Sequence, residues 1–135
     1  MYKISIYVYF IAIYIASVFR HKKAVQWING RKNLFSEIEK KVKTSHPLAW
    51  FHCASLGEFE QGRPLMEEFR IQYPTYKILL TFFSPSGYEV RKNYNGADYI
   101  FYLPIDTPAN AKRFLALTTP TLVFFFKYEF FFNFI

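Results

Sequence analysis

The sequence is poor in the residues that small disulfide-bonded and metal-binding folds depend on. Its 135 residues include a single cysteine, Cys53, which excludes an intramolecular disulfide and an all-cysteine metal cluster and fits a reducing compartment. The three histidines lack metal-ligand spacing with one another or with Cys53, so no metal site is expected. There is no GxGxxG motif, no P-loop and no GxSxG motif, which argues against dinucleotide-binding, P-loop and α/β-hydrolase sites.

Acidic residues are scarce in the first third of the chain. Residues 1–47 hold nine basic and two acidic side chains, whereas residues 48–135 hold eight of each sign. The net charge of +7 therefore belongs to the amino-terminal segment, and the neutral remainder lacks the basic surface of a nucleic-acid-binding domain. With 52% hydrophobic and 22% aromatic residues, the chain is too apolar to be disordered, and its length suits one modest domain.

The first segment is typical of a membrane anchor. No residue from Ile4 to Phe19 is charged, and the basic run Arg20-His21-Lys22-Lys23 follows. Sixteen helical residues reach roughly 24 Å against a hydrocarbon core of ~30 Å, so this helix either spans the bilayer marginally or lies at its surface. We expect residues 1–23 to be an anchor helix with a basic flank, and the positive-inside rule puts the following residues in the cytoplasm. A cleaved signal peptide and a buried helix are the alternatives.

Residues 24–47 are expected to form a connecting helical region. Asn29-Gly30 interrupts a first helix, Ser36 to Val42 has a short helical pattern, and Ser45-His46-Pro47 marks a boundary. From residue 48 onward, strand patterns alternate with amphipathic helices. The expected strands are 48–53, 76–83, 98–103 and 121–126, and the expected helices are 58–73, 88–93 and one that starts at 106–108.

This alternation predicts an α/β fold, a Rossmann-like parallel sheet with helices on both faces, over residues 48–135. We expect Pro64 in or near the first turns of its helix. The side chains expected to face inward are Leu65, Met66, Phe69 and Tyr73 on that helix, and Ala111, Phe114 and Leu115 on the last one. Ligands of such sheets bind beside the carboxyl ends of the strands, so the loops of interest are 54–58, 83–88, 103–108 and 127–133.

Two of these loops carry a carboxylate beside small residues. In Ser55-Leu56-Gly57-Glu58, Gly57 permits close approach of a ligand to the backbone, and Glu58 could accept a proton from a hydroxyl nucleophile. Ser55 and Glu58 also have the spacing of a capping box, and spacing alone favours that interpretation. Ser86 and Glu89 have the same spacing, and for them we prefer the capping box. The second feature, Lys127-Tyr128-Glu129, lies in an apolar run and is either a pair of functional residues or a solvent-facing turn.

Four segments together resemble one known family. They are His52 to Glu58, Ser84-Pro85-Ser86-Gly87, Tyr102 to Asp106, and Lys127-Tyr128-Glu129-Phe130. In order and spacing, and with the preceding hydrophobic segment, they resemble the amino-terminal part of 3-deoxy-D-manno-octulosonic acid (Kdo) transferases. The resemblance implies a GT-B glycosyltransferase, in which two Rossmann-like domains face a cleft, and residues 48–135 would be an incomplete acceptor-side domain.

The resemblance also implies a reaction and a place. Family members transfer Kdo from CMP-Kdo to a lipid A precursor in lipopolysaccharide synthesis, with inversion, on the cytoplasmic face of the Gram-negative inner membrane, and with no metal or other cofactor. Glu58 would be the general base, and the second acidic motif falls on Glu129, with Phe131 where a tryptophan is often found. The acceptor-side residues implied are Ser55, Gly57, Ser84, Ser86, Gly87, Lys127 and Glu129.

The partners expected are the two substrates and a membrane surface, not nucleic acid. A tethered domain meets a lipid-linked acceptor at raised effective concentration, and the basic residues between 20 and 32 would attract an anionic glycolipid. Because family members continue into a donor-binding domain, we expect this chain to be a truncated copy that transfers nothing alone. The alternative is a non-catalytic, membrane-anchored interaction module with the same half-fold.

Overall fold

A computed structural model describes residues 2–18, 22–126 and 134 of the chain. The strands are β1 (Leu48–Cys53), β2 (Lys77–Phe82), β3 (Tyr99–Tyr102) and β4 (Leu122–Phe126). The helices are α1 (Tyr2–Val18), α2 (Lys22–Asn29), α3 (Leu34–Lys41), α4 (Leu56–Gln72), α5 (Pro85–Arg91) and α6 (Pro108–Thr118). Two residues of interest, Lys127 and Glu129, lie outside the described residues, and the predictions made for them stay predictions.

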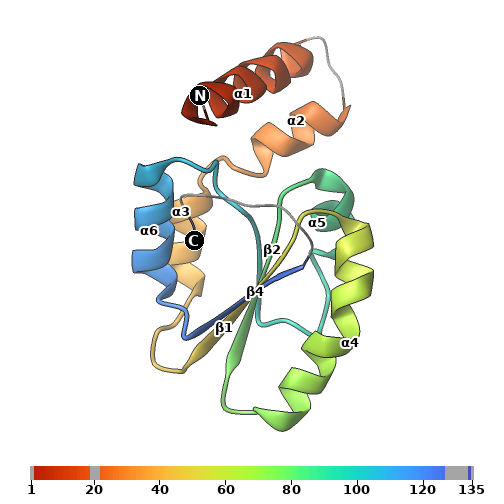
Figure 1. The fold of residues 1–135 in the computed structure, drawn as a ribbon, viewed down its shortest axis with the longest axis vertical. Coiled ribbons are helices and arrows are strands. Elements are labelled where there is room, and N and C mark those ends of the chain that lie inside the picture. The colour runs from red at the N-terminus through yellow and green to blue at the C-terminus, as the bar shows by residue number, and fades with distance from the viewer. Residues whose placement is uncertain (1, 19–21, 127–133, 135) are drawn as a thin grey trace.

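The four strands form one parallel sheet in the order β3-β2-β1-β4. Helices α3 and α6 cover one face of the sheet and α4 and α5 cover the other (Figure 1). All six residues of β1 are buried, as expected for a central strand of a sheet covered on both faces. The predicted α/β class, with a parallel sheet between helices, is therefore confirmed.

Aromatic side chains fill both cores. Trp50 points toward α6 and lies 4.9 Å, between ring centroids, from Phe114. The next residue, Phe51, points to the other face, where it stacks on Phe124 at 4.7 Å and meets Phe69 of α4 edge to face. Alternate residues of one strand thus serve opposite cores, which explains a continuous apolar run instead of an alternating one.

Helix α4 differs from its prediction in start and in rotation. It begins at Leu56, which leaves Pro64 in the interior of the helix instead of its first turns. Its buried residues are Phe59, Gly62, Met66 and Phe69. Leu65 and Tyr73 are 49% and 50% exposed, so their prediction as inward-facing residues was wrong. Helix α4 is rotated so that Gly62 faces the sheet. A β-carbon at position 62 would lie 2.7 Å from the Phe126 ring, which leaves no room for a side chain there.

The start of α5 also differs from its prediction, whereas that of α6 does not. Helix α5 begins at Pro85, three residues before the predicted start, with Ser84 extended at its N-cap. Helix α6 begins as predicted, and the Thr107 hydroxyl accepts a hydrogen bond from the Asn110 amide at 3.2 Å. Ala111 and Phe114 are buried as predicted, whereas Leu115 is only partly buried.

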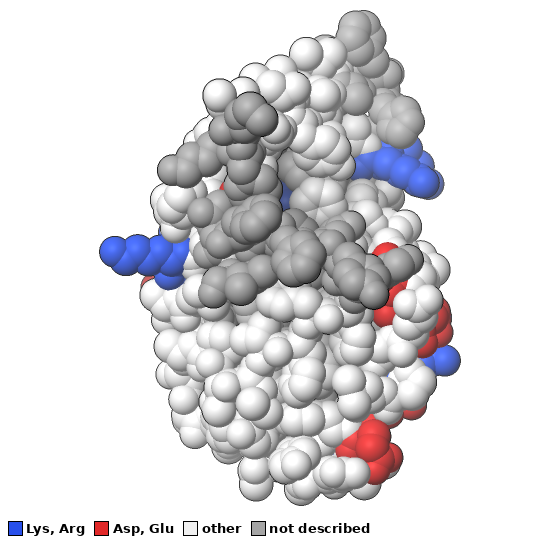
Figure 2. All heavy atoms as spheres, viewed as in Figure 1, with Lys and Arg blue, Asp and Glu red and all other residues white. Residues whose placement is uncertain are grey.

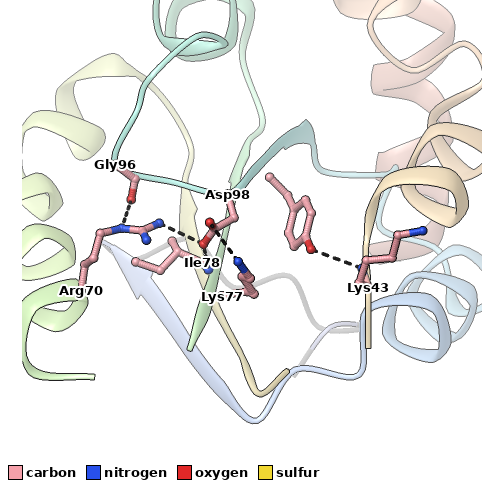
Figure 3. Close-up of polar contacts among 7 residues, drawn as sticks. Lys43, Arg70, Lys77, Ile78, Gly96 and Asp98 are labelled. Atoms are coloured by element: carbon pink, nitrogen blue, oxygen red, sulfur yellow. Dashed lines mark hydrogen bonds and ion pairs between the residues drawn. The ribbon is translucent and has the colours of Figure 1, made fainter. Parts of the chain in front are cut away.

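An ionic cluster closes the amino-terminal edge of the sheet, opposite the loops of interest (Figure 3). The Asp98 carboxylate accepts hydrogen bonds from the Ile78 amide at 2.7 Å and from the Arg70 guanidinium at 2.9 Å. The Lys77 ammonium lies 3.9 Å from its other oxygen. These contacts hold α4 and β2 to Asp98, the residue before β3, so they stabilise the packing at this edge of the sheet.

Helices α1 and α2 pack together above the carboxyl edge of the sheet (Figure 1). Of the helices expected in the connecting region 24–47, α3 lies inside it, whereas α2 begins at Lys22, in the predicted basic flank, and ends before Gly30. In the described part of the chain, we find no helix whose length and apolar character would let it cross a membrane. Below this helix pair, the face turned to the viewer in Figure 2 is largely uncharged, with acidic side chains gathered at the margin beside α4 and α5.

Candidate active site

The loops that follow β1, β2 and β3 are joined by backbone hydrogen bonds. The Ser84 amide donates to the Ala54 carbonyl at 2.9 Å, and the Leu103 amide donates to the Phe82 carbonyl at 2.8 Å. Helices α4, α5 and α6 all begin at this edge, so their amino-terminal N–H groups converge there. The structure thus brings together the predicted loops 54–58, 83–88 and 103–108.

Glu58 occupies the first turn of α4 and is half-buried. Ser55 is the N-cap residue of this helix, yet its side chain makes no capping hydrogen bond. Its hydroxyl instead donates to the Oε2 atom of Glu58. Ser55 therefore does not make the side-chain contact to the helix amides that a capping box requires, and the role of Glu58 as a base stays a prediction.

The two glycines of the candidate site have different surroundings. At Gly57, which is exposed, the nearest atom of the described residues to an added β-carbon is the Ser55 hydroxyl, 3.8 Å away, an ordinary van der Waals distance. At Gly87, which is buried, that β-carbon would lie 2.2 Å from the Phe82 ring. Close packing of α5 on β2 therefore accounts for Gly87, whereas no contact with the described residues requires a glycine at position 57.

Two serine hydroxyls lie at the start of α5. The Oγ atoms of Ser84 and Ser86 are 2.8 Å apart, and Ser86 is exposed while Ser84 is half-buried. The bond from Ser84 to the loop of β1 places this hydroxyl pair beside the segment that carries Glu58. Hydroxyls and helix amides together can bind the oxygens of a sugar or a phosphate.

The sequence did not indicate the position of Arg31, which contacts the loops at this edge. Its guanidinium donates to the carbonyl oxygens of Leu103 at 3.0 Å and Phe83 at 2.9 Å, and to that of Trp27 at 3.2 Å. It also lies 4.0 Å from the centroid of the Trp27 ring. Burial lowers the pKa of Arg31 to about 9.

This position corrects the expectation that the basic residues between 20 and 32 all attract a glycolipid. Arg31 instead fastens the segment after α2 to the loops that follow β2 and β3. Exposed cations that remain include Lys22, Lys23 and Lys32. No local signal distinguishes Arg31 from Lys32, because its carbonyl partners at positions 83 and 103 are distant in sequence.

His52 forms a buried polar contact under this edge. The hydroxyl of Thr81 accepts from the Trp50 indole at 2.8 Å and lies 2.8 Å from Nδ1 of His52. Burial, and next the positive charge of Arg31, lowers the pKa of His52 to about 3. The imidazole is therefore neutral at physiological pH.

We expect this histidine to make the fold acid-sensitive. The unfolded chain binds a proton at His52 below pH ~6.5, whereas the folded chain does not until pH falls to about 3. Stability is therefore lost as pH falls through this window, by ~1.4 kcal/mol per unit. The free energy of unfolding, measured with urea, should fall between pH of about 7 and about 5. We expect this fall to be ~2 kcal/mol smaller for His52→Gln than for the unaltered chain. His46→Gln, at an exposed position, should leave the decline unchanged; equal declines in all three would contradict the assignment.

The thiol of Cys53 is not a candidate nucleophile. It is fully buried, and burial, with the charge of Glu58 as a second cause, raises its pKa to about 12. A protonated, enclosed thiol neither attacks a substrate nor binds a metal. Over the described residues, no three His, Cys, Asp or Glu side chains come close enough together to hold a metal ion.

Comparison with known proteins gives consistent matches. The sequence profile of the family described as 3-deoxy-D-manno-octulosonic-acid transferase (kdotransferase) matches residues 28–135. A 3-deoxy-D-manno-octulosonic acid transferase of Aquifex aeolicus is 33% identical over 93 residues, which cover 68% of this chain and 26% of the relative. One from Chlamydia muridarum is 32% identical over 103 residues (74% and 24%), and one from Chlamydia trachomatis serovar D is 33% identical over 111 residues (80% and 25%). The chain thus spans about a quarter of the length of these relatives.

Proposed function

Because the chain belongs to the Kdo transferase family of glycosyltransferases, we propose that it forms the acceptor-side part of an inverting enzyme that transfers Kdo from CMP-Kdo to a lipid A precursor. In this proposal the chain supplies the base that activates the acceptor, and the donor is bound chiefly by a second, GT-B domain. No metal and no cofactor other than the donor substrate takes part.

The observation that carries the proposal is the arrangement of Glu58. This carboxylate lies in the first turn of α4, half-buried, and accepts a hydrogen bond from Ser55 beside the exposed Gly57. It would take the proton of an acceptor sugar hydroxyl while the hydroxyl oxygen attacks the anomeric carbon of Kdo and the bond to CMP breaks. Ser84 and Ser86 would bind the acceptor from the neighbouring loop, and Lys127 and Glu129 would extend this contact.

We also propose that the domain works at the cytoplasmic face of the inner membrane. Six side chains of α1 support this proposal because they are large, apolar and 50–68% exposed. They are Ile4, Tyr7, Val8, Ile11, Tyr14 and Ile15. Exposed Lys22 and Lys23 at the start of α2 would attract anionic head groups to the same side.

Two transfer assays test the proposed function. The purified chain, incubated with CMP-Kdo and lipid A precursor, should give no product, because it covers only about a quarter of its relatives. A chimera in which residues 28–135 replace the matching part of the Aquifex aeolicus transferase should transfer Kdo. Turnover by the chain alone would refute the need for a second domain. A folded but inactive chimera would instead favour the non-catalytic interaction module.

A further inference from the structure

The Arg31 guanidinium bridges the two loops that follow β2 and β3. Its Nη2 atom donates to the Phe83 carbonyl at 2.9 Å, and its Nε atom donates to the Leu103 carbonyl at 3.0 Å. These partners lie 52 and 72 residues from Arg31 in sequence, and each is the first residue after its strand. One side chain therefore fixes the points at which both loops leave the sheet.

The guanidinium is itself held in place by aromatic rings. Its central carbon lies 4.0 Å from the centroid of the Trp27 ring, 4.9 Å from that of Tyr102 and 5.2 Å from that of Phe83. Cation–π contacts of this kind favour one orientation of the planar group. The two carbonyls are thus bound to a donor that has little freedom to follow a moving loop.

The Phe83 carbonyl belongs to a peptide unit that is held from both sides. The N–H of the same planar unit is that of Ser84, which donates to the Ala54 carbonyl at 2.9 Å. The unit is therefore fixed between the guanidinium and the loop after β1. It leads directly into Ser84, whose hydroxyl lies 2.8 Å from that of Ser86. The placement of this hydroxyl pair thus depends on a group outside the loop.

We propose that Arg31 is a positioning residue for the acceptor, because it fixes the peptide unit that leads into Ser84 relative to the segment that carries Glu58. The inference rests on the proposed function, in which Ser84 and Ser86 bind the acceptor and a second domain binds the donor. A shift of this peptide unit moves the hydroxyls without changing their chemistry. The loss should therefore fall on binding of the acceptor and spare binding of the donor.

Arg31→Lys, made in the Aquifex aeolicus chimera that carries residues 28–135, tests the proposal. Lysine keeps the positive charge, but one ammonium does not reproduce the planar fork that serves two carbonyls. We expect KM for the lipid A precursor to rise about tenfold and KM for CMP-Kdo to stay within about twofold. The assays are run at a temperature at which circular dichroism shows the variant to be folded. Equal changes in the two KM values, or no change in either, would overturn the proposal.

Arg70→Lys is the matched control. The Arg70 guanidinium also holds a loop, through the Gly96 carbonyl at 3.1 Å and the Asp98 carboxylate at 2.9 Å, but at the opposite edge of the sheet (Figure 3). Its replacement loosens the fold without touching the candidate site, so both KM values should stay within about twofold. An equal rise in KM for the lipid A precursor in this control would show that general loosening is the cause, and the proposal would fail.

Amide hydrogen exchange on the intact chain, followed by NMR, separates this inference from the proposed function. Arg31→Lys should speed exchange of the Ser84 amide about fivefold and leave the Ile78 amide, which donates to Asp98, unchanged; Arg70→Lys should do the reverse. Unchanged exchange at Ser84 in Arg31→Lys overturns the positioning role, whatever the chimera does. An unaltered chimera that transfers no Kdo removes the proposed function and with it the acceptor as the ligand, while faster exchange at Ser84 would still show that Arg31 fixes the loop.

Discussion

Glu58→Gln is expected to lower kcat for Kdo transfer by ~10²–10⁴-fold in the Aquifex aeolicus chimera that carries residues 28–135. An amide of the same shape cannot accept the proton of the acceptor hydroxyl, so the nucleophile loses its base in the transition state. The substitution keeps the side chain length and an oxygen that can face the Ser55 hydroxyl. We therefore expect KM for the acceptor and the thermal midpoint to change little.

Glu68→Gln is the matched control for this prediction. Glu68 lies on the same helix, exposed, near its carboxyl end, where it accepts a hydrogen bond from Gln72. Its replacement removes the same charge from α4 without touching the carboxyl edge, so kcat should stay within about twofold. A Glu58→Gln chimera that transfers Kdo at a rate near that of the control would remove Glu58 from the mechanism.

Arg31→Met is expected to destabilise the fold by ~3 kcal/mol, a large part of the stability of a domain of this size. The guanidinium joins Leu103 and Phe83 of two separate loops and packs on the ring of Trp27. Methionine fills similar space but removes the guanidinium donors from these carbonyl oxygens, and each lost hydrogen bond costs free energy. Urea unfolding followed by circular dichroism measures the loss.

Arg63→Met provides the comparison. Arg63 lies 41% exposed on α4 and pairs with Glu60 and Glu67, also on the surface. Pairs of this kind contribute ~0–1 kcal/mol, so its removal should cost well under half as much as the loss of Arg31. Arg31→Lys should be intermediate, because one ammonium cannot reproduce the planar fork that serves several carbonyls. Equal losses for Arg31→Met and Arg63→Met would show that the buried contacts do not stabilise the fold.

The role of Arg31 links the amino-terminal helices to the site. The Arg31 guanidinium stacks on Trp27, whose ring contacts Tyr9 of α1, and it donates to the carbonyls of Leu103 and of Phe83, the residue before Ser84. Movement of α1 and α2 would therefore displace the loops at the carboxyl edge of the sheet.

The sequence by itself determined the sheet and the place of the candidate site. Apolar runs such as 48–53, bounded by small and polar residues, are local signals, and parallel strands alternating with helices bring their carboxyl ends to one edge. The segment from Ser55 to Glu58 was therefore placed correctly without coordinates. Its roles in catalysis and those of Lys127 and Glu129 stay predictions, carried by the family resemblance.

Only the tertiary structure decided how individual side chains are used. The rotation of α4 toward Gly62 depends on the ring of Phe126, which is remote in sequence. The enclosure of Arg31 and the neutral state of His52 depend on carbonyls and hydroxyls from other strands and loops. Local periodicity predicts which apolar residues are buried. A charged side chain is buried only where it finds hydrogen-bond partners, and these come from segments that only the folded chain brings within a few ångströms.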